Sequence, residues 1–306
     1  IPTAQYQTFE NAEKAHEYVN QKGAPIVIKA DGLAAGKGVV VAATLHEAHV
    51  AIDDMLLGNK MGNAGARVVI EDFLQGEEAS FIVMVDGDNV LPMATSQDHK
   101  RLLDGDCGPN TGGMGAYSPA PVVTYERAMN EIILPTVNGM KAEGHKFTGF
   151  LYAGLMIDKT GAPYTVEFNC RFGDPETQPI MSRLNSDLVD LLEAAIDGKL
   201  NSTIAEWNPQ TAVGVVLAAE NYPDTPKKGD IITGLDEADQ IGKVFHAGTV
   251  LNENGKVVTN GGRVLCVVGL GDNVAAAKTK AYQAVQKISF DGMQYRKDIA
   301  DKAINR

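Results

Sequence analysis

The first residues whose types and spacing suggest chemistry are a lysine and the glycine-rich loop that follows it. Lys29 ends the apolar run Ile26–Ile28, and the loop Gly32–Gly38 (GLAAGKG) comes next. Backbone N–H groups of such a loop, together with a lysine, bind phosphate groups. The spacing fits neither a Walker A motif nor a dinucleotide-binding glycine motif. A surface hairpin turn explains the loop equally well, but a lysine that closes a buried strand normally has an anionic partner.

A second candidate is Glu167-Phe168-Asn169, which lies on an expected strand. Side chains alternate along a strand, so Glu167 and Asn169 share one face and Phe168 points to the other. Two oxygen donors at this spacing suit Mg²⁺, which takes few protein oxygens and completes its shell with water and substrate phosphates. An edge strand with exposed polar residues also explains the spacing, and spacing alone favours that simpler explanation.

Two charged segments complete the candidates. The turn Arg171–Glu176 (RFGDPE) follows the Glu167–Asn169 strand directly, and Arg171 is a candidate anion clamp there. The alternative is a solvated turn with an Arg–Asp pair. The run Asp98–Arg101 (DHKR) leads into the glycine-rich segment Pro109–Gly115, and this combination suits a phosphate. Clusters of charge are usually solvated surface, so neither segment identifies a site by itself.

The elements expected to position these residues are short strands and helices. Helices are predicted over 8–23 with Thr8 as the N-cap, from 44 onward with Thr44 and Glu47 as a capping box, and over 125–141, 186–197 and 274–288. Strands are predicted over 26–29, 39–41, 67–73, 80–86, 151–158, 164–169, 213–218, 243–247, 256–259 and 263–268. The segment Asp98–Pro121 is predicted to be a loop, because glycine and proline are frequent in it.

Composition is typical of a folded, water-soluble protein. The 306 residues include 27 basic and 39 acidic side chains, and the net charge of −12 argues against a dedicated nucleic-acid binder. Apolar residues make up 44% and charged residues 22%, which is the balance of a globular protein. No segment predicts a membrane span or a signal peptide. Three cysteines without CxxC spacing favour a reduced, cytoplasmic protein.

Taken together and in this order, these segments resemble the ATP-grasp superfamily and, within it, the phosphoribosylamine–glycine ligase family. The resemblance rests on Lys29–Val39, Gln97–Arg101, Gly108–Pro119 and, most specifically, Arg171–Gln178, and it extends to Gly261–Leu265. It implies an α+β fold, in which two α+β ATP-grasp subdomains grip ATP and a smaller, strand-rich C-terminal domain follows. The implied boundaries are 1–75 for the small subdomain with the glycine loop, 76–206 for the large subdomain with the metal and substrate site, and 207–306 for the C-terminal domain.

The resemblance also implies a role for each matching residue. The nucleotide would bind Lys29, Gly36, Lys37 and Gly38 through its phosphates, Glu71, Phe73 and Leu74 through its adenine, and Glu78 through its ribose. Mg²⁺ or Mn²⁺ would bind Glu167 and Asn169, and the catalytic residues would be Arg171 and Lys29. The substrates would bind Asp98, His99, Lys100, Gly113, Asp174, Pro175 and Glu176. Many relatives carry a further acidic metal ligand on the preceding strand, where this chain has the apolar Gly154–Met156.

The implied reaction joins glycine to 5-phosphoribosylamine with ATP, through glycyl phosphate. It gives glycinamide ribonucleotide, ADP and phosphate in de novo purine biosynthesis. The family has a further N-terminal domain with a lysine that reaches ATP, and the chain starts at Ile1 where the nucleotide-binding part begins. We therefore expect a fragment that is inactive or weak alone, with the small-molecule substrates and that missing domain as its partners, and neither nucleic acid nor a membrane. Two alternatives stay open: another ATP-grasp carboxylate–amine ligase or carboxylase, and a nucleotide-binding fragment without turnover.

Overall fold

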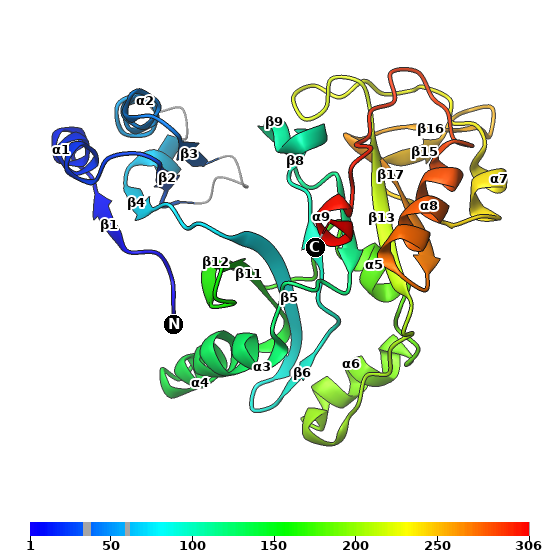
Figure 1. The fold of residues 1–306 in the computed structure, drawn as a ribbon, viewed down its shortest axis with the longest axis horizontal. Coiled ribbons are helices and arrows are strands. Elements are labelled where there is room, and N and C mark those ends of the chain that lie inside the picture. The colour runs from blue at the N-terminus through cyan, green and yellow to red at the C-terminus, as the bar shows by residue number, and fades with distance from the viewer. Residues whose placement is uncertain (33–37, 59–61, 306) are drawn as a thin grey trace. The chain divides into compact units, whose positions relative to one another are not determined.

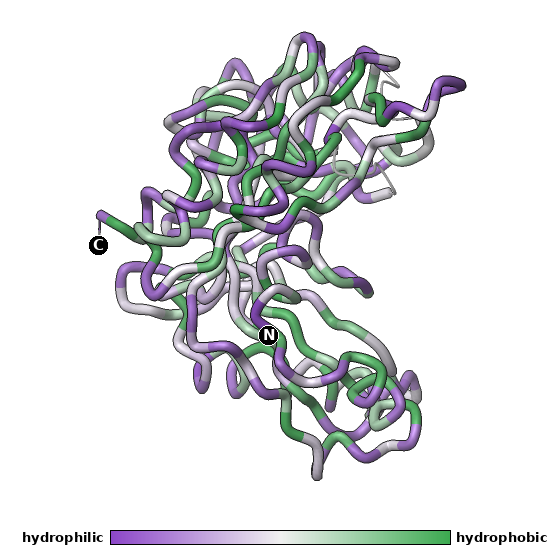
Figure 2. The backbone as a smooth tube through the Cα atoms, turned by 90° about the vertical axis from the view of Figure 1, so that its right-hand side faces the viewer, coloured by the Kyte–Doolittle hydropathy of each residue, from purple (hydrophilic) through white to green (hydrophobic). Residues whose placement is uncertain are grey.

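The chain divides into two compact units in the computed structural model, which describes residues 1–32, 38–58 and 62–305 (Figure 1). The N-terminal unit comprises Pro2–Gly76 together with Tyr164–Val166. The larger unit comprises Ile1, Glu77–Pro163 and Glu167–Arg306. The boundaries expected at 75/76 and 206/207 stay predictions. Along the backbone, hydrophobic stretches alternate with hydrophilic ones, which are common at the turns (Figure 2).

The N-terminal unit is an antiparallel four-stranded sheet with two helices on one face. The strands lie in the order β1-β4-β2-β3. Alternation along β2 buries Ile26 and Ile28 against the helices, while Lys29 lies on the opposite face. The elements are β1 (Tyr6–Phe9), α1 (Ala12–Lys22), β2 (Ile26–Ala30), β3 (Val39–Ala42), α2 (Leu45–Leu56), the 3-10 turn η1 (Gly62–Gly65) and β4 (Val68–Asp72).

The two helix starts show how far capping can be predicted from sequence. The expected cap at Thr8 is wrong, because Thr8 belongs to β1 and the Asn11 side chain caps α1 by accepting from Lys14 N at 2.9 Å. The capping box of α2 is confirmed. Thr44 Oγ1 accepts from Glu47 N at 3.2 Å, and the Glu47 carboxylate accepts from Ala43 N at 2.7 Å.

The first sheet of the larger unit has the order β12-β11-β5-β6 and is covered on both faces. Odd-numbered residues of β5, such as Phe81 and Val83, pack against the segment from η3 to α4. Even-numbered residues, such as Ile82, pack against α5 and α6. The elements are β5 (Glu77–Asp86), β6 (Val90–Pro92), α3 (Tyr125–Arg127), the π-helical η3 (Ala128–Ile133), α4 (Leu134–Ala142), β11 (Thr148–Ile157), β12 (Pro163–Asn169), α5 (Thr177–Met181), α6 (Leu188–Ile196) and the 3-10 turn η4 (Leu200–Ser202).

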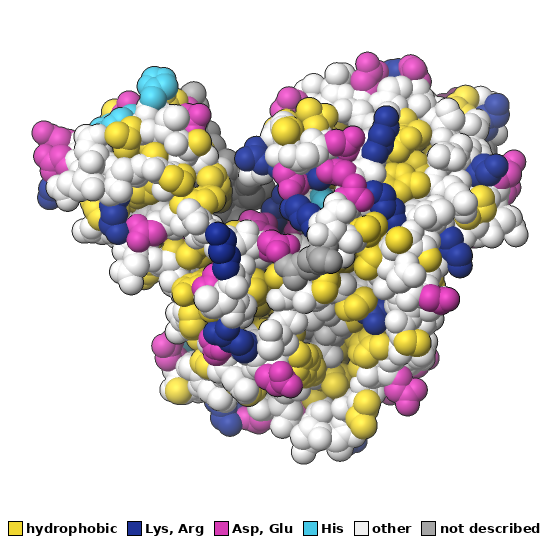
Figure 3. Space-filling view, viewed as in Figure 1, with side chains coloured by type: hydrophobic (Ala, Val, Ile, Leu, Met, Phe, Trp, Pro, Cys, Tyr) yellow, Lys and Arg dark blue, Asp and Glu magenta, His cyan; other side chains and the backbone are white. Residues whose placement is uncertain are grey.

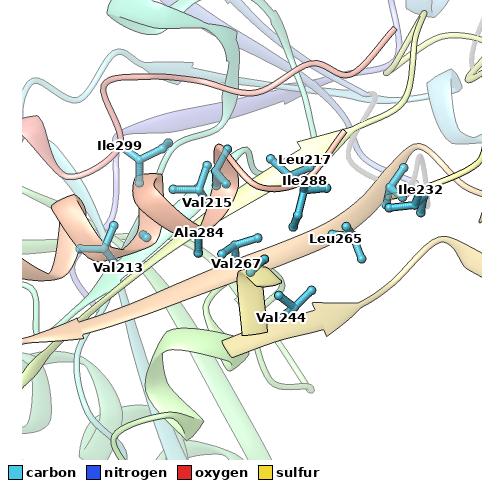
Figure 4. Packing of buried hydrophobic residues seen from close by; sticks show 14 of the residues in the cluster. Val213, Val215, Leu217, Ile232, Val244, Leu265, Val267, Ala284, Ile288 and Ile299 are labelled. Carbon is cyan, nitrogen blue, oxygen red and sulfur yellow. The ribbon is translucent and has the colours of Figure 1, made fainter. Parts of the chain in front are cut away.

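The second sheet of the larger unit has the order β14-β17-β13-β10-β7, and helix α8 packs on one face. Strands β13 and β17 run side by side, and their alternate residues form a core with α8 (Figures 1 and 4). The elements are β7 (Gln97–Asp98), β10 (Gly115–Ser118), β13 (Thr211–Ala218), β14 (Lys243–His246), β17 (Arg263–Gly271) and α8 (Val274–Val285), with α7 (Leu235–Asp239), β15 (Thr249–Leu251), β16 (Val257–Thr259) and α9 (Asp301–Ile304) around them.

The segment Asp98–Pro121 is not the loop that its composition predicts. It contains the hairpin β8 (Arg101–Leu103) and β9 (Cys107–Asn110), joined by the 3-10 turn η2 (Asp104–Asp106), and then β10. Strand β10 pairs with β13 on one side and β7 on the other. A Cβ atom at Gly115 would lie 2.6 Å from Gly214 O, so glycine here permits close strand pairing rather than a turn.

Helix and strand predictions elsewhere are confirmed in outline. The helix expected over 125–141 is present, but its central part is π-helical and precedes Pro135, which has no N–H for the regular i→i−4 bond. Among the helices that the structure describes, none is long and apolar enough to cross a lipid bilayer.

Candidate functional site

Lys29 lies on the face of β2 that is opposite to the helices. Its Nζ is 2.7 Å from Glu71 Oε2 on the neighbouring strand β4, and it donates to Val166 O at 3.4 Å. The anionic partner that Lys29 requires is therefore present within the chain. A phosphate contact stays a prediction, and it requires Lys29 to share or release Glu71.

The glycine loop is described only at its ends. Gly32 N donates to Ala64 O at 3.1 Å, and Gly38 is buried, with its carbonyl accepting from Ala30 N at 2.8 Å. The predicted nucleotide contacts Gly36 and Lys37 lie outside the described residues.

The segment predicted to hold adenine lies at the end of β4. Glu71 is paired with Lys29, Phe73 is exposed and Leu74 is half-buried. Phe73 and the neighbouring Asp72 line a cavity of about 310 Å³ in the N-terminal unit. Other residues that line it are Lys22, Gly23, Pro25, Ile26 and Gln75. A contact between this segment and adenine remains a prediction.

In the larger unit, the structure brings the predicted ribose contact Glu78 together with Lys100. Glu78 Oε2 lies 2.7 Å from Lys100 Nζ. Burial acts to lower the pKa of Lys100, but the carboxylates of Asp98 and Glu78 outweigh it and raise that pKa. Lys100 is therefore a permanent cation among carboxylates, and a ribose that binds Glu78 has to compete with it.

Glu176 is buried and held by two hydroxyl groups that sequence reasoning did not single out. Ser80 Oγ donates to Glu176 Oε1 at 2.8 Å, and Tyr152 OH donates to the same oxygen at 2.9 Å. The two hydroxyl oxygens are 2.8 Å apart. The alternation of β5 and β11 places Ser80 and Tyr152 on one sheet face, but no motif marks them, because their partner is distant in sequence.

Asp98 lies near this group, and its acidity is perturbed. Burial, and then the charge of Glu176, raise the pKa of Asp98 from 3.8 to about 7. Two carboxyl groups in one low-dielectric region resist holding two negative charges at once. Near neutral pH this region therefore holds a proton that is available for exchange.

Replacing Asp98 with asparagine is expected to increase the free energy of unfolding, relative to wild type, by more at pH 8 than at pH 5.5. The folded wild type keeps the Asp98 proton up to about pH 7, whereas the unfolded chain loses it near its ordinary pKa of 3.8. Wild-type stability therefore falls as the pH rises between these values. Urea unfolding at both pH values measures the difference, with the exposed Asp224→Asn as control. Equal differences at the two pH values would contradict the raised pKa.

His99 is buried in the larger unit rather than presented to a ligand. It is 1% exposed, its Nδ1 donates to Gly115 O at 3.4 Å, and its Nε2 accepts from Ala300 N at 3.3 Å. Burial, followed by the charge of Arg296, lowers its pKa to about 4. Both ring nitrogens are taken by backbone groups, which argues against the predicted direct substrate contact of this side chain.

Glu167 and Asn169 lie on one face at the end of β12, as the alternation predicts. Asn169 Nδ2 donates to Glu167 Oε1 at 3.2 Å, and Glu167 is exposed. A carboxylate beside an amide is an oxygen donor set that fits Mg²⁺, provided the amide turns to present its oxygen. The metal assignment of these two residues remains a prediction.

The structure brings together three of the predicted substrate residues, Gly113, Asp174 and Pro175. Arg171 precedes Asp174 by three residues in the chain. Arg171 is exposed and donates to Phe172 O at 3.0 Å. A Cβ atom at Gly113 would lie 2.4 Å from Pro175 Cδ, so glycine is required for this contact. Asp174 follows the same turn, and its exposed carboxylate lies 2.9 Å from Arg263 Nη2.

Arg263, at the start of β17, is a functional candidate to which sequence analysis assigned no role. Its Nη1 donates to Gly112 O at 2.6 Å and to Asp174 O at 2.8 Å. Gly112 N also donates to Tyr222 OH at 2.9 Å. One guanidinium group therefore joins the glycine-rich segment to the Asp174–Pro175 turn. An arginine after two glycines at a strand start is the signal that could have identified it.

The fold and the family models define the class of protein. The model described as the ATP-grasp (A) domain of phosphoribosylglycinamide synthetase matches residues 1–177, and the model for the C domain of that synthetase matches residues 212–302. The biotin carboxylase domain of Hydrogenobacter thermophilus 2-oxoglutarate carboxylase is similar in fold, with a TM-score of 0.71 at 15% identity over 96% of this chain and 64% of that chain. The chain is thus an ATP-grasp protein.

Closer relatives identify the family. The phosphoribosylamine–glycine ligase of Neisseria meningitidis serogroup B is 87% identical over 100% of this chain and 73% of its own length. The ligase of Ralstonia nicotianae is 67% identical over the same shares. The crystal structure of the Thermotoga maritima ligase has a TM-score of 0.89 at 40% identity, covering 98% of this chain and 75% of that chain. The chain belongs to the phosphoribosylamine–glycine ligase family.

Proposed function

We propose that the chain takes part in the ATP-dependent ligation of glycine to 5-phosphoribosylamine, which gives glycinamide ribonucleotide, ADP and phosphate in de novo purine biosynthesis in the cytoplasm. The observation that carries this proposal is the similarity to phosphoribosylamine–glycine ligases over the whole chain, at up to 87% identity. Likeness to biotin carboxylases is at 15% identity, which supports a shared fold and not a shared reaction.

The reaction has two steps. The glycine carboxylate first attacks the γ-phosphorus of ATP, and glycyl phosphate and ADP form. The amine of phosphoribosylamine then attacks the acyl carbon, so that the C–N bond forms, phosphate leaves and the nitrogen loses one proton. Asp98, with a pKa of about 7, is suited to accept that proton near neutral pH.

The residues of each unit have separate proposed roles. In the N-terminal unit, Lys29, the loop Gly36–Gly38 and the segment Glu71–Leu74 bind the nucleotide. In the larger unit, Glu78 binds the ribose and Arg171 steadies the transferred phosphoryl group. The proposed substrate residues are those that the structure gathers around Lys100 and around the Gly113–Pro175 contact, namely Asp98, Lys100, Gly113, Asp174, Pro175 and Glu176.

Glu167 and Asn169 are the residues that would hold Mg²⁺ or, with the same oxygen donors, Mn²⁺. The ion, when bound, neutralises charge on the phosphate oxygens during transfer. Lys29 and Arg171 supply further positive charge, and Lys100 balances the carboxylates around it.

An isotope-transfer experiment tests the proposed reaction directly. Because the chain matches 73% of the length of the Neisseria meningitidis ligase, it is supplied with the remaining part of that ligase and incubated with ATP, Mg²⁺, phosphoribosylamine and glycine that carries ¹⁸O in its carboxylate. An acyl phosphate route transfers one ¹⁸O atom to the released phosphate, which mass spectrometry detects. Glycinamide ribonucleotide formed with unlabelled phosphate would contradict the route, and ADP formed only with another carboxylate would contradict the substrate assignment.

A further inference from the structure

A pair of histidines joins the two helices of the N-terminal unit. His16 on α1 and His49 on α2 face each other, with their Nδ1 atoms 2.7 Å apart and their ring centroids 4.8 Å apart. Both side chains are half-buried, and histidine side chains are visible on this unit over α1 and α2 (Figure 3). None of the proposed ligase residues takes part in this pair.

The outer nitrogen of each ring has an oxygen acceptor. His16 Nε2 lies 2.9 Å from Asp53 Oδ1, and His49 Nε2 lies 3.0 Å from Asn20 Oδ1. A carboxylate oxygen only accepts, so the His16 hydrogen is on Nε2. The amide oxygen of Asn20 places the His49 hydrogen on Nε2 in the same way. With the Asn20 amide in this orientation, both Nδ1 atoms of the neutral pair present lone pairs to each other, and a cation between them, either a metal ion or a proton, relieves the repulsion.

This is the arrangement found at histidine metal sites, where an oxygen acceptor on the outer nitrogen fixes the tautomer and makes the inner nitrogen a better donor. Two nitrogens at 2.0–2.1 Å from a metal lie about 2.9 Å apart in square-planar or octahedral geometry and about 3.4 Å apart in tetrahedral geometry. The observed separation of 2.7 Å is closer to the first value. Cu²⁺ and Ni²⁺ prefer that geometry, and Cu²⁺ binds nitrogen ligands most tightly.

We propose that His16 and His49 form a binding site for one Cu²⁺ or Ni²⁺ ion, which links α1 to α2 through their Nδ1 atoms. Among the described residues there is no group of three or more histidine, cysteine, aspartate or glutamate side chains that holds a metal. The site therefore has two protein donors, and water fills the remaining positions because both side chains reach solvent. Asp53 and Asn20 act through the imidazoles as positioning residues.

Titration of the metal-free chain with Cu²⁺ and with Ni²⁺ tests the site, because it needs no enzyme activity. Calorimetry is expected to show one equivalent bound, with Cu²⁺ tighter than Ni²⁺. Electron spin resonance of the Cu²⁺ form is expected to show coupling to two nitrogens. His16→Asn and His49→Asn should each abolish this saturable binding. His46→Asn is the matched control, because His46 is an exposed histidine on the same helix, and it should bind as the wild type does.

A second variant keeps both imidazoles and tests the positioning role. Asp53→Asn is expected to weaken Cu²⁺ binding by roughly 10-fold or more, because loss of a partner on the outer nitrogen costs ~10–100-fold in affinity. Circular dichroism of each metal-free variant checks that the fold is retained. Absence of saturable binding in the wild type would overturn the proposal and leave a proton as the shared cation, and binding that survives His16→Asn and His49→Asn would overturn it too.

Discussion

The Glu167→Gln variant is expected to lose most of the Mg²⁺-dependent part of its ATP affinity while keeping its fold. Glu167 is exposed at the end of β12, and its carboxylate accepts from the amide of Asn169 at 3.2 Å. Glutamine has a similar shape and keeps one oxygen that can accept from Asn169 Nδ2, so the strand should be unaffected. What it removes is the negative charge, and a carboxylate is the stronger of the two oxygen donors for Mg²⁺.

The size of the effect follows from the position of the residue. Removing a group that only supports a metal ligand weakens metal binding by ~10–100-fold, so removal of a direct ligand should weaken it by roughly 100-fold or more. Calorimetry with ATP, in the presence and absence of Mg²⁺, measures this increment for the wild type and the variant. Binding is used as the readout because it does not require turnover.

Glu193→Gln is the matched control, since Glu193 is an exposed glutamate on α6. It should keep the full increment from Mg²⁺. If Glu167→Gln and Glu193→Gln bind Mg-ATP equally well, the metal assignment to Glu167 and Asn169 is wrong. If ATP binding without Mg²⁺ also disappears in Glu167→Gln, the residue acts on the nucleotide or the fold rather than on the metal.

The parts of the fold that were predicted correctly depend on local information. The alternation of Ile26 and Ile28 identifies β2 and its buried face. The capping box marks the start of α2 because its two residues, Thr44 and Glu47, are only three positions apart. The start of α1 was misplaced because Thr8 and Asn11 are both suitable caps. The choice depends on pairing of β1 with β4, which lies about 60 residues further along the chain.

The loop prediction for Asp98–Pro121 failed for a different reason. Glycine and proline usually interrupt strands, but Gly115 lies in β10 where the neighbouring strand approaches too closely for a side chain. Composition alone does not distinguish a glycine that permits a turn from one that permits close packing. The distinction requires knowledge of the partner strand β13.

The candidate site shows the same division between local and distant information. The shared face of Glu167 and Asn169 follows from two-residue spacing. The ion pairs Lys29–Glu71, Glu78–Lys100 and Asp174–Arg263 join residues on different elements, and no pattern in the sequence links them. Sequence reasoning therefore named most charged residues of the site but not their partners, and it did not indicate that His99 is buried.

Replacement of Arg296 with methionine is expected to give the largest loss of stability among these variants. Arg296 is 1% exposed and follows α8 in the chain. Its guanidinium group binds both carboxylate oxygens of Asp298 at 2.7 Å, and its Nη1 donates to Asp106 Oδ1 at 2.8 Å. Nη1 also donates to Arg101 O at 3.2 Å, so one side chain joins the C-terminal segment to the β8–β9 hairpin.

Methionine fills a similar volume but leaves Asp298 without its cation, while Asp106 keeps its ion pair with Lys302. Breaking a buried ion pair from one side costs ~3–5 kcal/mol, and about 3 kcal/mol is expected here because Asp106 is partly exposed. Urea unfolding measures the loss, and hydrogen exchange should show faster exchange at Ala300 N, which donates to His99.

The stability of Arg296→Lys should fall between those of the wild type and Arg296→Met, since lysine keeps the charge but loses the bidentate contact. Arg67→Met removes an exposed ion pair with Asp31 and should change stability little. If Arg296→Met is no less stable than Arg67→Met, the buried guanidinium does not hold the C-terminal segment in place.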